Sequence, residues 1–394
     1  MDFNYLIDVS SLLLRWLHLI VGIAWIGSSF YFVWLDNSLQ PPTDPALKAK
    51  GVGGELWAVH GGGFYNPQKY LVAPAHLPKE LHWFKWESYS TFITGFFLLG
   101  VLYYAQAATY MIDPMRAALT PASAVGIGLA TLVVGWLVYD TLCRVLMRRS
   151  LLLFAALYFL FVVAVAWGLT QLLSGRAAFL HVGAMIATTM SANVFFWIIP
   201  GQKKTIAIMQ RGETPDPIHG LRAKQRSVHN NYLTLPVLFC MISNHYAFTY
   251  NHPQAWLVLA LILLAAVLIR HFFNLRHKGV FAWPYPAAGG ALLLGVFIWL
   301  APAPLAVSAN GAPAVADIQP LLTARCAGCH SATPTLMPAA PAGVVLDTEA
   351  QIRANGPRIL AQTVQLKAMP LGNITEMTDD ERQQIAAWAG GGYR

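Results

Sequence analysis

The long apolar segments of this chain limit its fold more than any other feature. Eight stretches reach roughly the 20 residues that a helix needs to cross the hydrocarbon core of a bilayer. Only 11% of the residues are charged and 56% are hydrophobic, whereas soluble domains carry about 25% charged residues. The sequence therefore predicts an all-α, polytopic membrane helix bundle over residues 1–302. The predicted spans are 11–35, 88–110, 122–143, 151–173, 179–200, 230–250, 254–272 and 283–302.

The placement of basic residues predicts the orientation of these spans. Residues 1–316 contain 20 Lys and Arg against 11 Asp and Glu. They border apolar segments, which indicates a lipid bilayer and not nucleic acid as the partner. Positive loops stay in the cytoplasm, so both termini are predicted to lie outside. The opening segment has no basic leader, and we interpret it as a retained helix. The basic loops hold Lys48, Lys50, Lys69, Lys79, Lys85, Arg144, Arg148, Arg149, Lys203, Lys204, Arg211, Arg222, Lys224, Arg226, Arg270, Arg276 and Lys278, and the others Arg116 and Arg176.

A short motif near the C-terminus, Cys326-Ala-Gly-Cys329-His330, has the C-x-x-C-H spacing of a covalent c-type haem site. The two thiols would form thioethers with the porphyrin, and His330 would be the proximal iron ligand. A C-x-x-C pair can also be a redox dithiol or half of a zinc site. The following His argues against the first, and the lack of a second Cys pair argues against the second. Bacteria attach this haem outside the cytoplasm, which agrees with the orientation predicted from charge.

The C-terminal segment, residues 317–394, is predicted to be a small class I cytochrome c domain with one haem c, joined by a Pro/Ala-rich linker at 303–316. His330 is its only histidine, so the sixth iron ligand should be a methionine. Met369-Pro370 resembles the loop that carries this ligand in small cytochromes c, and Met337 is the runner-up, with Met377 as the third methionine. Asp317 is a candidate N-cap, and Thr378-Asp-Asp-Glu381 is a capping box.

Three histidines in the predicted spans share the outer leaflet in this topology. His18 lies one turn after Arg15, a cation suited to a propionate; His181 opens the fifth span, and His245 lies in the sixth. Ionisable groups inside spanning helices are costly and mark functional sites. A pair of these histidines could ligate a b-type haem. Alternatively, each histidine bonds a polar group of a neighbouring helix.

A second polar group is expected at the cytoplasmic ends of the spans. Glu87, Asn193, His229 and Asn230 are not interfacial anchors of the kind that Trp and Tyr provide. Polar groups buried in a membrane need partners, so we predict that these residues line a polar pocket. The glycine triplet after His60 does not match a phosphate-binding loop. It is expected to allow close approach of the backbone to a ligand or a helix.

Several short strings spread over the whole chain carry a family resemblance. They are Trp16-Leu-His18, His60-Gly-Gly-Gly-Phe64-Tyr65, Trp83-Phe-Lys-Trp86-Glu87, Asn193-Val-Phe-Phe-Trp197, His229-Asn-Asn-Tyr232-Leu-Thr-Leu-Pro236 and Ser243-Asn-His245-Tyr246. With the C-terminal cytochrome, they resemble the membrane-bound bacterial urate oxidase (urate hydroxylase) family. The resemblance implies oxidation of urate to 5-hydroxyisourate in the bacterial inner membrane. Electrons would pass to the periplasmic cytochrome c domain and on to an acceptor such as a soluble cytochrome c or a terminal oxidase.

The chemistry of that reaction suits residue types in the predicted pocket. Removing two electrons and two protons from urate leaves an electrophile to which water adds at C5, so water is the oxygen source. Glu87 or His229 is the candidate base, with His60 in support. The candidates for binding planar urate are the amides of Asn193, Asn230 and Asn231 and the ring of Trp86.

Two other functional classes stay open. A respiratory cytochrome subunit that relays electrons from quinol would need bis-histidine pairs stacked along two helices. The histidines of this chain do not repeat at matching depths within one helix. A transporter with a fused redox domain would favour broken helices in inverted repeats, and no such repeat is evident. Reduction of the haem by quinol but not by urate would favour the first alternative.

Overall fold

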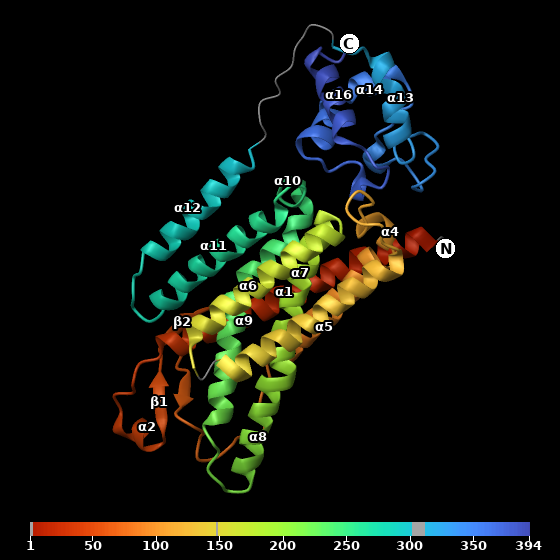
Figure 1. Cartoon of the computed structure of the whole chain (residues 1–394). Coiled ribbons are helices and arrows are strands. Elements are labelled where there is room, and N and C mark those ends of the chain that lie inside the picture. Colours follow the sequence, from red (N-terminus) through yellow and green to blue (C-terminus); the bar gives the residue numbers. More distant parts are fainter. Residues whose placement is uncertain (1–2, 147–148, 302–311) are drawn as a thin grey trace.

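The computed structural model describes residues 3–146, 149–301 and 312–394, and helices dominate, with 69% helix and 4% strand. Long helices form an elongated bundle, with a small helical unit at one end and short strands at the other (Figure 1). The N-terminus lies at the same end of the bundle as the C-terminal unit. The first helix therefore runs from that end towards the strands.

Helices cover all eight predicted spans. They are α1 (Phe3–Ser38), α3 (Trp86–Leu99), α5 (Pro121–Leu146), α6 (Leu151–Leu172), α7 (Gly175–Asn193), α9 (Ile218–Ile242), α11 (Ala255–Arg276) and α12 (Pro284–Trp299). The shorter elements between them are α4 (Ala107–Tyr110), α8 (Ile199–Gln210), α10 (Ala247–Tyr250), and π-helical turns at Gly100–Tyr104 and Val194–Ile198.

Five helical segments of the described chain are long and apolar enough to cross a membrane: α1, α5, α6, α7 continued by α8, and α11. The other three predicted spans fall short for separate reasons. α3 gives way to a π-helical turn after 14 residues, and α12 has 16 residues. α9 begins with a polar half that includes Arg222, Lys224 and Arg226. The count of eight spans stays a prediction, and Arg148, used for the orientation, lies outside the described residues.

α7 lies at the centre of the bundle, as the buried residues on every side of it show. Glycines let its neighbours approach closely. The side chain of Met185 fills the space beside Gly135 of α5, and Cys240 of α9 fills the space beside Gly183. Small residues at contacts allow this close packing between membrane helices. The fully buried apolar side chains of α7 are Ala177, Ala178, Phe179, Val182, Met185 and Ile186.

Short strands, which the sequence analysis did not predict, occupy part of the segment between α1 and α3. The elements are α2 (Pro45–Ala49), β1 (Val52–Glu55), β2 (Ala58–His60), β3 (Gly63–Tyr65) and β4 (Gln68–Tyr70). β1 pairs antiparallel with β4, and β2 pairs antiparallel with β3. Gly61 and Gly62 connect β2 to β3 with φ of 58° and 80°. A type I′ two-residue hairpin turn needs positive φ at both positions, which explains the glycines.

The C-terminal unit has an apolar core of its own. It contains α13 (Val315–Cys326), α14 (Glu349–Ala354), α15 (Gly356–Ile359), a π-helical turn (Leu360–Gln365) and α16 (Asp379–Gly390). The Thr378–Glu381 capping box is confirmed at the start of α16. The Asp317 N-cap was wrong, because α13 begins earlier and the Asp317 carboxylate accepts the Ala314 N–H. Of the predicted linker, residues 303–311 lie outside the described residues. The core residues are Val315, Ile318, Leu322, Leu346, Ile352, Ile359, Met377, Ile385 and Trp388.

Candidate functional site

A buried ion pair joins α5 to α9 inside the bundle. The Arg226 guanidinium donates from Nη2 to Oδ1 of Asp140 at 2.7 Å, and the two residues are 3% and 7% exposed. Trp197 donates from Nε1 to the same oxygen at 2.7 Å, and Arg144 donates from Nε to Oδ2 at 2.6 Å. Trp197 lies in the π-helical turn after α7, a kind of irregularity that is frequent at functional sites. Charges inside a membrane domain are costly unless paired, and they mark functional sites.

Amide and aromatic groups extend this ion pair into a network. Asn193 accepts from Arg226 Nη1 at 3.1 Å and donates to Tyr139 Oη at 3.0 Å and Asn230 Oδ1 at 2.9 Å. Asn230 donates to the Met190 carbonyl at 2.9 Å, and Tyr139 Oη lies 2.8 Å from His229 Nδ1. We call this set the α5–α7–α9 network. Its members are Tyr139, Asp140, Asn193, Arg226, His229 and Asn230.

The network brings together three of the residues predicted to share a pocket, Asn193, His229 and Asn230. It adds Asp140 and Arg226, which the sequence analysis did not select. A signal for Asp140 was present, because a carboxylate inside the predicted span 122–143 is costly and marks a site. Arg226 was counted as a loop cation, although it lies four residues before Asn230 and so on the same face of a helix.

The other predicted substrate residues lie apart from this network. Glu87 is in the first turn of α3, and its Oε2 is buried without a hydrogen-bond partner among the described residues. Asn231 is fully buried but accepts from Arg270 Nε of α11 at 2.8 Å. Trp86 is 64% exposed, and His60 is exposed at the β2–β3 turn. The structure does not bring Trp86 or His60 to the network, because both lie at the surface.

The three histidines predicted to share the outer leaflet each contact a different part of the bundle. His18 Nδ1 lies 3.0 Å from Thr94 Oγ1 of α3, and Arg15, one turn earlier, is exposed. His181 is fully buried and donates from Nδ1 to the Ala177 carbonyl at 2.8 Å. His245 is exposed in the short turn that follows α9.

The b-type haem between two of these histidines stays a prediction. His181 Nε2 is buried without a partner among the described residues. A Cβ at Gly128 would lie only 2.6 Å from this atom, so α5 packs against the side on which an iron would bind. The His18 ring packs in the same way, since a Cβ at Gly95 of α3 would lie 2.9 Å from its Cε1. Each of these two rings fills the space beside a glycine and bonds locally. We therefore derive no step through a membrane haem.

The C-x-x-C-H motif forms a tight turn at the end of α13. The backbone N–H groups of Cys329 and His330 both donate to the Cys326 carbonyl, at 3.1 and 2.8 Å. Both cysteines are free thiols. His330 donates from Nδ1 to the Val344 carbonyl at 3.1 Å, which leaves Nε2 as the ring nitrogen for an iron. Two free thiols and an oriented imidazole fit the covalent attachment and proximal ligation of a c-type haem.

Two further observations bear on other metal or redox uses of this motif. Burial raises the pKa of the Cys326 thiol to about 12 and also raises the pKa of Cys329. Redox-active dithiols instead have a lowered pKa, because the thiolate is the reactive form. Over the described ranges, no group of three or more His, Cys, Asp or Glu side chains is placed to hold a metal ion. The structure therefore favours neither a redox dithiol nor a zinc site here.

The methionines of the C-terminal unit differ in their surroundings. Met377 is 2% exposed in the core with Ile385 and Trp388, so it fills the core. Met369 is half-buried, and its carbonyl accepts from Arg382 Nη1 at 2.9 Å. Met337 follows Leu336, whose N–H bonds the Gly328 carbonyl within the motif. Met369 and Met337 are thus the methionines of this unit that lie outside the buried core, and the assignment of a sixth iron ligand stays a prediction.

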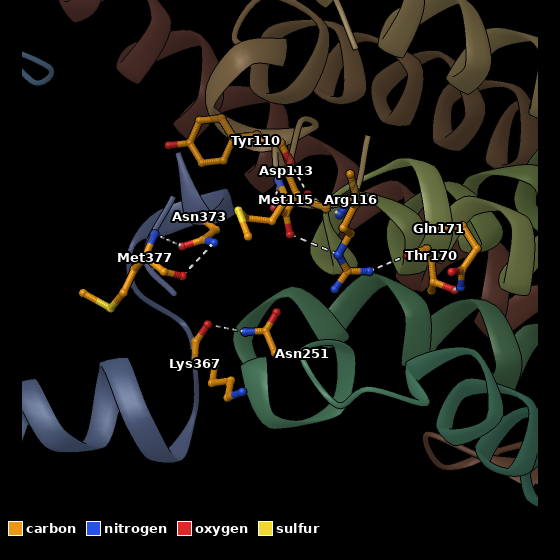
Figure 2. A network of polar contacts seen from close by, with 12 residues as sticks. Tyr110, Asp113, Met115, Arg116, Thr170, Gln171, Asn251, Lys367, Asn373 and Met377 are labelled. Atoms are coloured by element: carbon orange, nitrogen blue, oxygen red, sulfur yellow. Dashed lines mark hydrogen bonds and ion pairs between the residues drawn. The ribbon is translucent and has the colours of Figure 1, made fainter. Parts of the chain in front are cut away.

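The loop that carries Met369 docks on the end of the bundle. Figure 2 shows the Asn251 side chain directed at the Lys367 carbonyl, to which it donates at 2.8 Å; it also donates to the Leu366 carbonyl at 3.2 Å. Gly372, with φ of 58°, packs against the bundle so closely that a Cβ would lie 2.8 Å from the Thr109 carbonyl oxygen. A cavity of about 310 Å³ lies between the two parts and is lined by both. The bundle thus positions the Met369 loop directly.

Comparison with known protein families gives one match, and it covers the helical bundle. The model of the family described as "Urate oxidase N-terminal" matches residues 4–301, a segment that contains the whole α5–α7–α9 network. No curated protein and no solved structure matches the chain. Because the match covers well over half of its length, this chain belongs to the urate oxidase N-terminal family.

Proposed function

We propose that this protein is a membrane oxidoreductase that oxidises urate within its helical bundle and delivers the electrons to a haem c in its C-terminal unit. The observation that carries the proposal is the family match over residues 4–301. The same residues hold buried polar groups in an otherwise apolar bundle. The C-terminal unit contributes thiols and an imidazole that suit haem c.

The proposed reaction converts urate to 5-hydroxyisourate. Urate loses two electrons and two protons, and water then adds at C5 and supplies the new oxygen. Groups that accept protons near neutral pH are needed for the N–H groups of urate and for water. Glu87 has a buried carboxylate oxygen without a partner among the described residues, and it is the candidate for one of these roles. His229, held by Tyr139 through Nδ1, offers Nε2 for the other.

The C-terminal unit is proposed to hold one haem c. Cys326 and Cys329 would bind it covalently, His330 would be the proximal ligand, and Met369 the sixth. A haem with His and Met ligands accepts and donates single electrons and has no open site for substrate. The backbone turn that holds both cysteines and the Val344 carbonyl that orients His330 support the covalent and proximal parts of this proposal.

The electrons have to travel along most of the bundle. From Gly175, which lines the cavity under the C-terminal unit, to Asn193 in the network, α7 rises about 27 Å at 1.5 Å per residue. Tyrosines lie at both ends of this path. Tyr139 belongs to the network, and Tyr103 bonds Arg176, a residue of the cavity wall. We include these tyrosines as candidate steps for electron transfer.

The C-terminal unit and the N-terminus are proposed to lie on the periplasmic side of a bacterial inner membrane, and the positive loops support this orientation. The five candidate spans support a membrane location. An acceptor such as a soluble periplasmic cytochrome c or a terminal oxidase would then take the electrons. Binding of haem c and reduction of such an acceptor are the parts of the proposal that the family match does not cover.

An isotope experiment tests the source of the new oxygen. The purified protein turns over urate without oxygen, with an excess of oxidised cytochrome c as acceptor, in oxygen-18-labelled water. Trapped early product is expected to carry one labelled oxygen at C5. A parallel reaction in ordinary water under labelled dioxygen should give unlabelled product. Label derived from dioxygen, or turnover that stops when oxygen is removed, would contradict the proposed chemistry.

A further inference from the structure

A second polar cluster lies on a different face of α9 from the α5–α7–α9 network. Its members Asn231, Arg270 and Asn274 are 0%, 5% and 6% exposed. Arg270 Nε donates to Asn231 Oδ1 at 2.8 Å, which ties α11 to α9. The Arg270 guanidinium also lies over the Phe30 ring of α1, 3.9 Å from its centroid. Three helices therefore hold one buried cation in place.

Hydrogen-bonding atoms of this cluster lack partners within the described residues. They are Arg270 Nη2, Asn231 Nδ2, both Nδ2 and Oδ1 of Asn274, and Nδ1 of His277. The Tyr232 side chain is the polar neighbour of Asn274. Arg270, Asn274 and His277 are spaced four and then three residues apart, so they lie along one face of α11. Each buried polar atom without a partner costs about 1–3 kcal/mol. A ligand that bonds several of these atoms at once would recover that cost.

The carboxylate and amide atoms of the α5–α7–α9 network, unlike those of this cluster, all have hydrogen-bond partners. There, both Asp140 oxygens, both amide atoms of Asn193 and both amide atoms of Asn230 have partners. A ligand could bond those atoms only by breaking existing hydrogen bonds. The saturated network is suited to holding the helices, and the unsaturated cluster is suited to binding a molecule.

The free hydrogen-bond donors and acceptors of this cluster define the kind of molecule that it could bind. Arg270 brings a positive charge, and among the described residues it has no carboxylate partner. The free atoms of Arg270, Asn231 and Asn274 present several N–H donors and a single amide acceptor. A planar anion with carbonyl oxygens around its edge and at least one N–H matches this set. Water could bond the amides but would leave the charge without a partner.

We propose that Arg270, Asn231 and Asn274 form the binding site for the oxopurine anion that the enzyme oxidises. This inference rests on the proposed function, since it names the site where urate binds. His229 faces Tyr139 of α5 on another side of α9, so with urate bound here Glu87 is the candidate base and His229 only holds the network. Arg270 would pair with the urate charge and a carbonyl oxygen, which Arg does well because its N–H groups are fixed in a plane. Asn274 would accept a urate N–H through Oδ1 and donate through Nδ2. Of these residues, only Asn231 was selected from the sequence.

The test compares equilibrium binding and turnover for matched variants of the full-length protein in detergent. Binding of radiolabelled urate is measured by equilibrium dialysis, and kcat and KM are measured without oxygen from the reduction of excess oxidised cytochrome c. Arg270→Gln is expected to weaken binding about 10- to 100-fold, since a charge-assisted hydrogen bond is lost. Arg276→Gln, the same change at an exposed position of the same helix, should bind as the wild type does. Arg270→Lys should recover part of the affinity.

A second variant separates binding from folding. Asn274→Asp has nearly the same shape and places a carboxylate one helical turn from Arg270, so the fold should be kept and the melting temperature maintained or raised. Urate binding should still be lost, because the new carboxylate neutralises Arg270. Wild-type affinity in both Arg270→Gln and Asn274→Asp, with a wild type that binds and oxidises urate, would overturn the site and leave the function standing. A wild type that neither binds urate nor is reduced by it would overturn both.

Discussion

Asp140→Ala is expected to lower the free energy of unfolding of the helical bundle by about 3–5 kcal/mol, the range for breaking a buried ion pair by removing one partner. The reason is the isolation of Arg226, which is 3% exposed and would keep its charge without a carboxylate. Trp197 and Arg144 would lose their acceptor as well. Unfolding of the purified protein in mixed micelles, followed by tryptophan fluorescence, measures the change.

Two controls show whether the charge itself is responsible. The double variant Asp140→Leu with Arg226→Met removes both charges, and it should regain most of the stability because apolar side chains can replace a buried pair. Glu213→Ala breaks an exposed pair with Arg211, and it should have no measurable effect. An Asp140→Ala protein as stable as the wild type would show that Arg226 is not held as described.

Met369→Leu is expected to remove the absorption band that arises from charge transfer between a methionine sulfur and haem iron. It should also lower the reduction potential by more than about 100 mV, because a Met ligand raises the potential and axial ligands set it over a wide range. Optical spectra of the oxidised protein and a redox titration measure both effects. Cys326 and Cys329 are untouched, so the haem should stay covalently attached.

The matched control is Met377→Leu, since Met377 lies in the core of the same unit. This variant should keep the band and the potential while losing some stability. Loss of the band in Met337→Leu instead of Met369→Leu would move the sixth ligand to Met337. A band that persists in all three variants would mean that none of these methionines is the ligand.

The helices of the bundle were predictable from the sequence, because apolar length is a local property. The side-chain contacts between different helices were not predictable from the sequence. Asn230 and Asn231 are neighbours in the sequence, yet one bonds Asn193 of α7 and the other Arg270 of α11. Successive residues point about 100° apart around a helix, so adjacent amides belong to different sites. Both amides were predicted to bind the same ligand, because the sequence does not show which helix lies beside each face of α9.

The position at which α9 begins explains why Arg226 was not predicted to be part of the site. The apolar run begins near residue 230, but the helix begins at Ile218. Arg226 therefore lies within a helix and reaches Asp140, although its sequence surroundings are typical of a basic loop. The surface positions of His60 and Trp86 depend on the fold of the segment between α1 and α3, whose strands are three or four residues long. Strands of this length give little signal in a sequence.

The C-x-x-C-H spacing, in contrast, is visible in the sequence alone, because the chemistry of haem attachment is local; the haem c that it indicates stays a prediction. What the structure adds is the orientation of His330 by the Val344 carbonyl and the contact of the Met369 loop with Asn251. The first contact lies within the C-terminal unit, and the second joins residues that are far apart in the chain. The second therefore connects the C-terminal unit to the end of the bundle, and a function that needs both parts requires such a connection.

Anaerobic reduction of the haem by urate tests the central claim most directly. The purified, oxidised protein is mixed with urate in the absence of oxygen, and the α-band of the haem is followed. The account predicts that the band appears in full with urate. It should be absent at the same concentration of xanthine, which lacks the C8 oxygen and does not carry hydrogens on both N7 and N9. A haem that stays oxidised with urate but is reduced by quinol would contradict the account.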